Sequence, residues 1–315
     1  MDSHSVSNIT VLGQGVMGPD IALGFAMAGY RVTGVDIADG PLHKAAQKIK
    51  SNCRQMVDGG MLTETESNQI CRRISFSLDL EESVRGADYV MEAVPEDMGI
   101  KQEIFAGCGD LCPPWVVVAS NTSSMSITRI ASGMRFAERA ITTHWTIPAH
   151  LSPMVEVARG EKTSDETESC VVKLLEGMGK CPVVCKDTPG FIHNYIQFAM
   201  IRAALDLIES GTAAPQDVDR VVKNGFGLRI SSVGPVEFMD MCGLDTILKI
   251  QQYLFQMTGS RVYEPSKTIE DFVSQGNLGV KSGKGFYSHG AGRSEGFWER
   301  TNPAIIRILG AIKRS

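Results

Sequence analysis

The stretch Gly13-Gln14-Gly15-Val16-Met17-Gly18 follows an apolar run at residues 9–12 and precedes a helical pattern at residues 20–28. In this G-x-G-x-x-G pattern the first glycine permits a tight turn and the second lets the backbone approach a pyrophosphate. The third allows the helix to pack closely on its strand. The pyrophosphate would lie at the helix N-terminus, where amide N–H groups and the helix dipole favour an anion. The stretch therefore predicts a strand, turn and helix that bind a dinucleotide.

An acidic residue follows this motif at the spacing of about 20 residues that dinucleotide-binding units show. Asp36 comes directly after the next apolar run, residues 31–35. Its carboxylate would accept hydrogen bonds from the adenosine ribose hydroxyls, and its charge would repel a 2′-phosphate. We therefore expect NAD rather than NADP as the cofactor.

Composition narrows the class of protein. The chain has 315 residues, 43% hydrophobic and 21% charged, which is enough for a sizeable core and two domains. A net charge of -5 and a pI near 5.7 argue against a nucleic-acid partner. The polar start at residues 1–8 does not resemble a signal peptide, and no apolar run reaches the ~20 residues of a membrane span. We expect a cytoplasmic protein without a membrane partner.

The eight cysteines show no regular spacing. Cys108 and Cys112, like Cys181 and Cys185, are four residues apart, and neither pair has the C-x-x-C form or a nearby histidine typical of a zinc site. We interpret them as reduced thiols and expect no metal.

Short apolar runs alternate with helical patterns through the first half of the chain. The runs that we interpret as buried strands are residues 9–12, 31–35, 89–93, 116–120 and 140–143, with 154–158 and 182–185 as further candidates. Such alternation builds a parallel sheet with helices on both faces. After Thr188-Pro189-Gly190 the patterns are helical. The sequence thus predicts an α/β fold, with a Rossmann-type doubly wound N-terminal domain (residues 1–188) and an all-α C-terminal domain (residues 189–315) for substrate binding and dimerisation.

Further motifs carry a resemblance to one family. They are Ser120-Asn121-Thr122-Ser123-Ser124, the segment from His144 to Met154-Val155-Glu156-Val157, Cys185-Lys186-Asp187-Thr188-Pro189-Gly190-Phe191-Ile192-His193-Asn194, Gly234-Pro235-Val236-Glu237 with Gly243-Leu244-Asp245, and Gly279-Val280-Lys281-Ser282-Gly283-Lys284-Gly285-Phe286-Tyr287. Because these motifs occur in the order and spacing typical of that family, the sequence resembles the 3-hydroxyacyl-CoA dehydrogenase family over nearly the whole chain.

The resemblance implies that His144 is the catalytic base and Glu156 the carboxylate that orients it. Oxidising a secondary alcohol needs a base for the hydroxyl proton, and imidazole suits this near neutral pH. A carboxylate on the other ring nitrogen fixes the tautomer and stabilises the imidazolium. By the same resemblance, Ser123 and Asn194 are polar partners of the substrate oxygens.

The resemblance also places Glu96, Lys101 and Asn121 against the nicotinamide ribose, with Ala93 in the same cofactor site. From the residues alone, Ser123 is equally a helix N-cap, and Lys101 a solvated helix residue. We interpret His150 as a substrate-pocket residue and His193 as incidental.

Three departures from the family bear on the substrate. The family's H-F-F-N-P is here His144-Trp145-Thr146-Ile147-Pro148, and the turn Val57-Asp58-Gly59-Gly60-Met61-Leu62 has no lysine for the phosphates of CoA, although Lys44, Lys48, Lys50 and Arg54 lie nearby in the sequence. The Pro148–Pro153 segment, residues 148–153, and the Gly227-Leu228-Arg229 stretch resemble carnitine dehydrogenase and the gulonate 3-dehydrogenase/lambda-crystallin group. Arg229 would clamp a free carboxylate, or cap a surface loop.

We therefore predict an NAD-dependent dehydrogenase that interconverts a small-molecule 3-hydroxyacyl substrate, of the 3-hydroxyacyl-CoA type, and its 3-keto form. We also expect a homodimer. One alternative is a dehydrogenase of a free 3-hydroxy acid, carnitine- or gulonate-like. Another is a non-catalytic NAD-binding structural protein, which would not require Ser123, His144, Glu156 and Asn194 together. A 2-hydroxy acid or 6-phosphogluconate-like dehydrogenase would not explain the spacing from His144 to Glu156.

Overall fold

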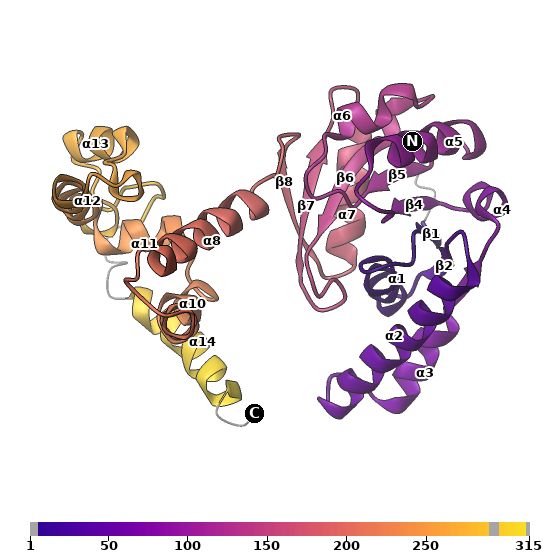
Figure 1. The fold of residues 1–315 in the computed structure, drawn as a ribbon, viewed down its shortest axis with the longest axis horizontal. Coiled ribbons are helices and arrows are strands. Elements are labelled where there is room, and N and C mark those ends of the chain that lie inside the picture. Colours follow the sequence, from indigo (N-terminus) through magenta and orange to yellow (C-terminus); the bar gives the residue numbers. More distant parts are fainter. Residues whose placement is uncertain (1–5, 290–295, 313–315) are drawn as a thin grey trace. The chain divides into compact units, whose positions relative to one another are not determined.

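The computed structural model describes residues 6–289 and 296–312. The chain forms two compact units, residues 1–200 and 201–315. The division falls within helix α8 (His193–Glu209), which continues from one unit into the next (Figure 1). Our boundary between residues 188 and 189 lies shortly before this helix and stays a prediction.

The first unit contains one sheet of eight strands in the order β3-β2-β1-β4-β5-β6-β7-β8. The strands are β1 (Asn8–Leu12), β2 (Arg31–Val35), β3 (Ile74–Ser77), β4 (Tyr89–Glu92), β5 (Val117–Ser120), β6 (Ala140–Trp145), β7 (Met154–Arg159) and β8 (Cys181–Lys186). This confirms the predicted doubly wound α/β fold. The strand β3 was missed, because its four residues alternate serine with apolar side chains at the sheet edge.

Neighbouring strands are parallel except β6 and β7, which are antiparallel. The predicted parallel arrangement therefore holds for every neighbouring pair except this one. The strand order reverses between β1 and β4, and such a switch point opens a crevice at the carboxyl ends of the strands. The crevice is where a ligand of this fold class binds.

The helices of the first unit connect and flank the strands (Figure 1). They are α1 (Gly18–Met27), α2 (Asp39–Asp58), α3 (Glu64–Arg72), α4 (Leu80–Arg85), α5 (Met98–Leu111), α6 (Ile127–Ile130) and α7 (Asp165–Gly177). Of these, α2 and α3 are consecutive helices between β2 and β3. A capping box begins α3, since Thr63 accepts from the amide of Glu66 while the Glu66 carboxylate accepts from that of Thr63.

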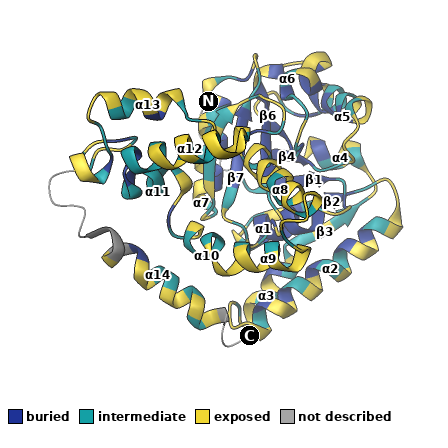
Figure 2. Ribbon diagram, turned by 60° about the vertical axis from the view of Figure 1, so that its left-hand side comes forward, coloured by how far each residue is buried: buried dark blue, intermediate teal, exposed yellow. Residues whose placement is uncertain are grey.

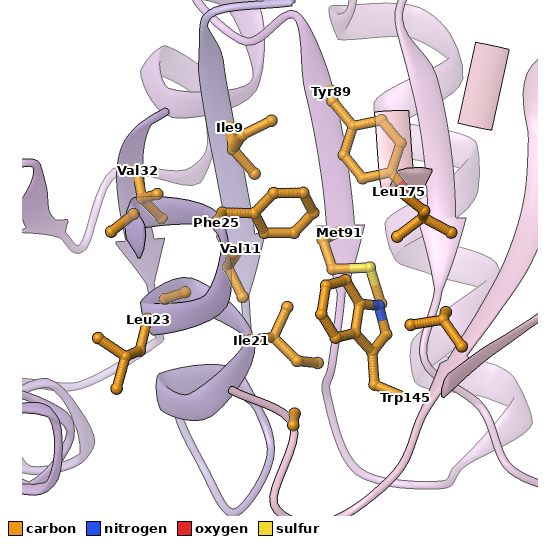
Figure 3. Close-up of a cluster of buried hydrophobic side chains, with 14 of the residues drawn as sticks. Ile9, Val11, Ile21, Leu23, Phe25, Val32, Tyr89, Met91, Trp145 and Leu175 are labelled. Carbon is orange, nitrogen blue, oxygen red and sulfur yellow. The ribbon is translucent and has the colours of Figure 1, made fainter. Parts of the chain in front are cut away.

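The core of this unit lies between the sheet and α1. Figure 3 shows Phe25 of α1 among side chains of β1 and β4, with Trp145 from the end of β6 nearby. The ring centroid of Phe25 lies 5.4 Å from that of Trp145 and 5.8 Å from that of Tyr89. Trp145 is 2% exposed, and burial of so large an apolar side chain holds the end of β6 against α1. The residue before it, His144, is thereby fixed in place.

The second unit is helical. After α8 it contains α9 (Pro215–Asn224), α10 (Phe226–Ile230), α11 (Pro235–Cys242), α12 (Leu244–Thr258), α13 (Lys267–Ser274) and α14 (Gly296–Ile312). The buried carboxylate of Asp240 accepts the amides of Phe286 (3.0 Å) and Tyr287 (2.9 Å). This carboxylate holds the predicted Gly279–Tyr287 motif, residues 279–287, against α11. Within the described part of this unit no strand is present beyond isolated bridges.

Exposed residues, yellow in Figure 2, follow one side of the surface helices of the first unit, while its central strands are dark blue. No helix in the described ranges combines the length and the apolar character that crossing a membrane requires.

Candidate active site

A cavity of about 1280 Å³ lies within the first unit, at the carboxyl ends of the central strands. Leu12 and Gly13 line it after β1, Ala93 to Glu96 after β4, and Asn121 after β5. Typical pockets for one drug-sized ligand measure about 300–1,000 Å³. This cavity is larger, which suits a dinucleotide together with a substrate.

The glycine motif forms one end of the cavity. Gly13 has φ +89°, which glycine adopts without strain, and a Cβ atom there would lie 2.7 Å from the carbonyl oxygen of Ala93. A Cβ atom on Gly18 would lie 1.9 Å from the carbonyl oxygen of Gly13, so only glycine lets α1 pack this closely. A Cβ atom on Gly15 would meet no protein atom within 4 Å. Gly15 therefore faces open space that a pyrophosphate can fill.

No side chain caps the start of α1, where Met17 is the N-cap residue. The first amides of the helix are therefore free for an anion. Val16 and Met17 line the cavity beside them. The loop thus has the geometry that a dinucleotide cradle requires.

Asp36 lies on the cavity wall beyond this loop. One carboxylate oxygen accepts the amide of Gln14 (2.7 Å), and the other accepts the amide of Ile37 (2.8 Å). These bonds hold the carboxylate next to the glycine loop, and each oxygen retains a lone pair for a ribose hydroxyl.

His144 and Glu156 are directly opposite each other on the antiparallel strands β6 and β7. The His144 Nδ1 atom lies 2.7 Å from Oε2 of Glu156. His144 is 6% exposed and Glu156 is 1% exposed. Since His144 also lines the cavity, its Nε2 atom is the ring nitrogen left for a ligand.

The other carboxylate oxygen of Glu156 anchors the start of α8. It accepts the amides of Ile192 (2.8 Å) and His193 (2.7 Å). Burial alone would raise the pKa of Glu156, but the hydrogen bonds from His144 and from these amides outweigh it and lower the pKa. Glu156 is therefore ionised at neutral pH.

The turn before α8 makes this contact possible through an unusual backbone. Gly190 has φ +82° and Phe191 has φ +47°, a left-handed conformation that is uncommon outside glycine. Phe191 is buried, and its ring centroid lies 5.8 Å from that of His144. The predicted Asp187-Thr188-Pro189-Gly190 motif thus directs two amides onto one carboxylate.

Ser123 and Asn194 lie together on the cavity wall. The side-chain amide of Asn194 donates to the carbonyl oxygen of Ser123 (3.0 Å). The Ser123 hydroxyl does not cap a helix, because Ser126 is the N-cap of α6. The structure thus brings Ser123, His144, Glu156 and Asn194 into one region.

Glu96 fastens the loop that carries Ser123. Its Oε1 atom accepts the amides of Ser123 (3.1 Å) and Ser124 (3.2 Å) and the Ser124 hydroxyl (2.9 Å). Burial raises the pKa of Glu96, but hydrogen bonding by the Thr122 hydroxyl and the charge of Lys101 bring it below its ordinary value. Glu96 lines the cavity, as does Asn121, whose side-chain oxygen accepts the amide of Trp145 (2.9 Å).

Lys101 is not solvated, since it is 1% exposed. Its ammonium group lies 2.8 Å from Oε1 of Glu92 and 3.3 Å from Oε2 of Glu96. Glu92 is fully buried and also accepts the Ser120 hydroxyl (2.6 Å). Sequence reasoning missed Glu92, although a single acid within an apolar strand signals a buried partner.

Of the two predicted substrate residues, one is off the cavity wall and the other belongs to the second unit. His150 is not among the residues that line the cavity. Its Nδ1 atom lies 3.7 Å from Oδ1 of the buried Asp20 in α1. Arg229 belongs to the second unit, where its guanidinium stacks 3.6 Å from the ring centroid of Phe238. Ile147, which replaces the family's asparagine, does line the cavity and is 72% exposed.

Among the described residues, no group of three or more histidine, cysteine, aspartate or glutamate side chains gathers as metal ligands. The eight cysteines are all free.

Comparison with known families adds two matches. The model for the NAD binding domain of 3-hydroxyacyl-CoA dehydrogenase matches residues 8–188. The model for the C-terminal domain of 3-hydroxyacyl-CoA dehydrogenase matches residues 190–289.

Individual proteins show the same similarity. A probable 3-hydroxybutyryl-CoA dehydrogenase of Bacillus subtilis is 38% identical over 284 residues, which cover 90% of this chain and 98% of that protein. The 5-formyl-3-hydroxy-2-methylpyridine 4-carboxylate 5-dehydrogenase of Mesorhizobium japonicum is 33% identical, with 90% and 91% covered. The crystal structure of a 3-hydroxyacyl-CoA dehydrogenase from Archaeoglobus fulgidus matches with a TM-score of 0.81 and 30% identity, covering 96% of this chain and 99% of that one.

Proposed function

Because the chain belongs to the 3-hydroxyacyl-CoA dehydrogenase family, we propose that it interconverts a 3-hydroxyacyl substrate and its 3-keto form. It is an oxidoreductase that acts on CH-OH, and the NAD binding domain confirms the predicted cofactor. The observation that carries the proposal is the His144–Glu156 pair, which lies in the same cavity as the glycine loop.

The glycine loop and Asp36 would hold NAD. Gly15 leaves room for the pyrophosphate, the amides at the start of α1 would bind it, and Asp36 would accept the ribose hydroxyls. Glu96 and Asn121 would lie at the nicotinamide end, beside Ala93. Lys101 would act indirectly, because it is buried against Glu92 and Glu96. When bound, NAD⁺ supplies the acceptor for the hydride that leaves C3.

His144 would remove the proton from the C3 hydroxyl through Nε2. Its Nδ1–H donates to Glu156, which leaves the Nε2 lone pair free to accept the proton. The ionised Glu156 then balances the charge of the imidazolium. In the reverse direction the imidazolium returns the proton to the carbonyl oxygen. Ser123 and Asn194 would orient the substrate oxygens from the same wall of the cavity.

The CoA thioester is the favoured form of the substrate, because the two family models together match residues 8–188 and 190–289. Of the cations that remain for CoA, Lys48 pairs with Asp20 (3.1 Å), and Arg54 with Asp58 (2.9 Å) and Glu64 (3.3 Å). Lys44 and Lys50 are exposed and have no ion-pair partner within the described ranges.

A free 3-hydroxy acid is the second candidate substrate. The name of the Mesorhizobium relative gives a pyridine carboxylate as its substrate, and this substrate is a free acid rather than a thioester. Ile147 also makes this part of the site more apolar than the family pattern. A purely structural role is disfavoured, because Ser123, His144, Glu156 and Asn194 are all present and lie together.

We also propose a homodimer formed through the second unit. Its helices carry exposed apolar side chains, among them Ile250 (50%), Tyr253 (63%) and Met257 (66%) of α12. Apolar surface of this extent favours association. A cytoplasmic location fits the eight free cysteines.

The function is tested by following NADH absorbance with NAD⁺ and a panel of 3-hydroxyacyl-CoA thioesters and free 3-hydroxy acids. We expect turnover of at least one 3-hydroxyacyl compound. Turnover of 2-hydroxy acids alone would contradict the proposal.

A further inference from the structure

His193 is the second imidazole of the active-site cavity. It begins α8, lines the cavity and is half-buried. Its ring centroid lies 6.0 Å from that of His144, with the ring planes at 70°. Within residues 6–289 and 296–312, no protein group forms a hydrogen bond with the His193 ring. The His193 ring is thus a polar group on the cavity wall whose hydrogen-bonding capacity is left for a ligand.

The backbone fixes the position of this ring relative to the catalytic base. The amide of His193 donates to Oε1 of Glu156 (2.7 Å), and Oε2 of the same carboxylate bonds His144 (2.7 Å). One buried carboxylate therefore holds the ring of His144 and the backbone of His193. When the hydroxyl of a substrate contacts His144, the imidazole of His193 therefore lies close to the same substrate.

The chemistry of a 3-hydroxyacyl compound matches this spacing. Its C1 oxygen and its C3 oxygen are separated by a three-carbon chain, which keeps them a few ångströms apart. Imidazole carries an N–H donor in its neutral and its protonated form, and an acyl oxygen is an acceptor. Resting on the proposed function, we propose that His193 determines specificity by donating a hydrogen bond to the C1 acyl oxygen of the substrate.

That oxygen is the carbonyl of a thioester or one oxygen of a free carboxylate. Gln197, one helical turn further along α8, lines the same cavity. It adds a second polar side chain to the cavity lining, whereas Ile147, which also lines the cavity, adds an apolar one.

The matched variants are His193→Leu and His193→Gln. Leucine removes the donor, while glutamine keeps an N–H at similar reach. Both keep the backbone amide that Glu156 accepts. Tyr195→Leu is the control, because Tyr195 lies on the same helix, is 77% exposed and does not line the cavity.

The assay compares 3-hydroxybutyryl-CoA, 3-hydroxybutyrate and 2-butanol, which lacks the C1 oxygen, with NADH binding measured by fluorescence. We expect His193→Leu to raise KM for the preferred acyl substrate by about 10- to 100-fold. A change of this size corresponds to the loss of one hydrogen bond to a charged or strongly polar group. Since this bond is present before and during the reaction, kcat and NADH binding stay near wild type. His193→Gln recovers most of the KM, and activity on 2-butanol does not fall.

The acyl substrate whose KM rises in His193→Leu shows whether the C1 oxygen belongs to a thioester or to a free carboxylate. Unchanged acyl KM in His193→Leu, or equal losses of kcat and NADH binding in His193→Leu and His193→Gln, would overturn this inference and leave the proposed function standing. A wild-type enzyme that oxidises neither acyl substrate would overturn both.

Discussion

Glu156 bonds His144 with one carboxylate oxygen and the start of α8 with the other, so a single buried side chain joins the catalytic base to the helix that carries Asn194. The antiparallel pairing of β6 and β7 places the two residues opposite each other. The site therefore depends on this carboxylate being ionised.

Acid should weaken this arrangement. The pKa of Glu156 in the folded protein lies below its ordinary value of 4.5, so its contribution to stability is fully present above that value. The contribution is lost as the pH falls from about 4.5 through the folded-state pKa. Urea unfolding of wild type and Glu156→Gln across this range measures it. The difference in unfolding free energy should shrink as the pH falls, and a constant difference would contradict the assignment.

The cofactor preference should depend on the charge of Asp36. Asp36→Ser should raise the use of NADP relative to NAD, because the charge that repels a 2′-phosphate is gone. Asp36→Asn is the matched variant, since it removes the charge and keeps an oxygen for the amide of Gln14 or Ile37. The ratio of kcat/KM values for the two cofactors is the readout. A wild-type enzyme that already prefers NADP would show that the role of Asp36 is wrong.

Arg229 separates the two substrate classes. For a free acid, Arg229→Ala should raise KM about 10- to 150-fold by removing a charge-assisted clamp worth about 1.5–3 kcal/mol. For a CoA thioester this change should matter little, and combined Lys48→Met, Lys50→Met and Arg54→Met should matter more. Arg229→Lys keeps the charge and loses the stacking geometry over Phe238. Unchanged free-acid kinetics in Arg229→Ala, with acyl-CoA turnover that falls in the lysine and arginine variants, would exclude the free-acid alternative.

The buried Lys101–Glu92 pair should be essential for stability. Lys101→Met leaves the Glu92 carboxylate without its cation at full burial, which typically costs about 3–5 kcal/mol. Adding Glu92→Gln should restore part of this loss, because no uncompensated charge then remains. Urea unfolding of both single variants and the double variant gives the coupling. If the double variant lost as much unfolding free energy as the two single variants together, Lys101 and Glu92 would not be coupled.

Local patterns predicted the glycine turn between β1 and α1. The glycine turn depends on three nearby residues and on a following helix, so Gly13, Gly15 and Gly18 are readable from the sequence alone. The His144–Glu156 pair could be predicted only from the family motif. Nothing in the local sequence shows that β6 and β7, the strands that carry the two residues, pair in antiparallel fashion.

Tertiary packing decided what the sequence did not reveal. An exposed lysine and a buried one look alike on an amphipathic helix, and only Glu92 and Glu96 explain why Lys101 is buried. The sequence also did not show that His193 lines the cavity and His150 does not, since the direction of a loop side chain depends on its neighbours. The Nδ1 atom of His150 lies 3.7 Å from Oδ1 of Asp20 in α1, whereas Glu156 accepts the backbone amide of His193 at the site.

The central claim is that His144 is the base of the dehydrogenase reaction. The most direct measurement is kcat of His144→Ala beside NADH binding of the same protein, with Glu156→Gln as the milder comparison. The account predicts a kcat lower by roughly 10²- to 10⁴-fold with NADH binding near wild type, and a smaller loss in Glu156→Gln, whose amide still holds the ring but does not balance an imidazolium. Near-normal turnover by His144→Ala would contradict it.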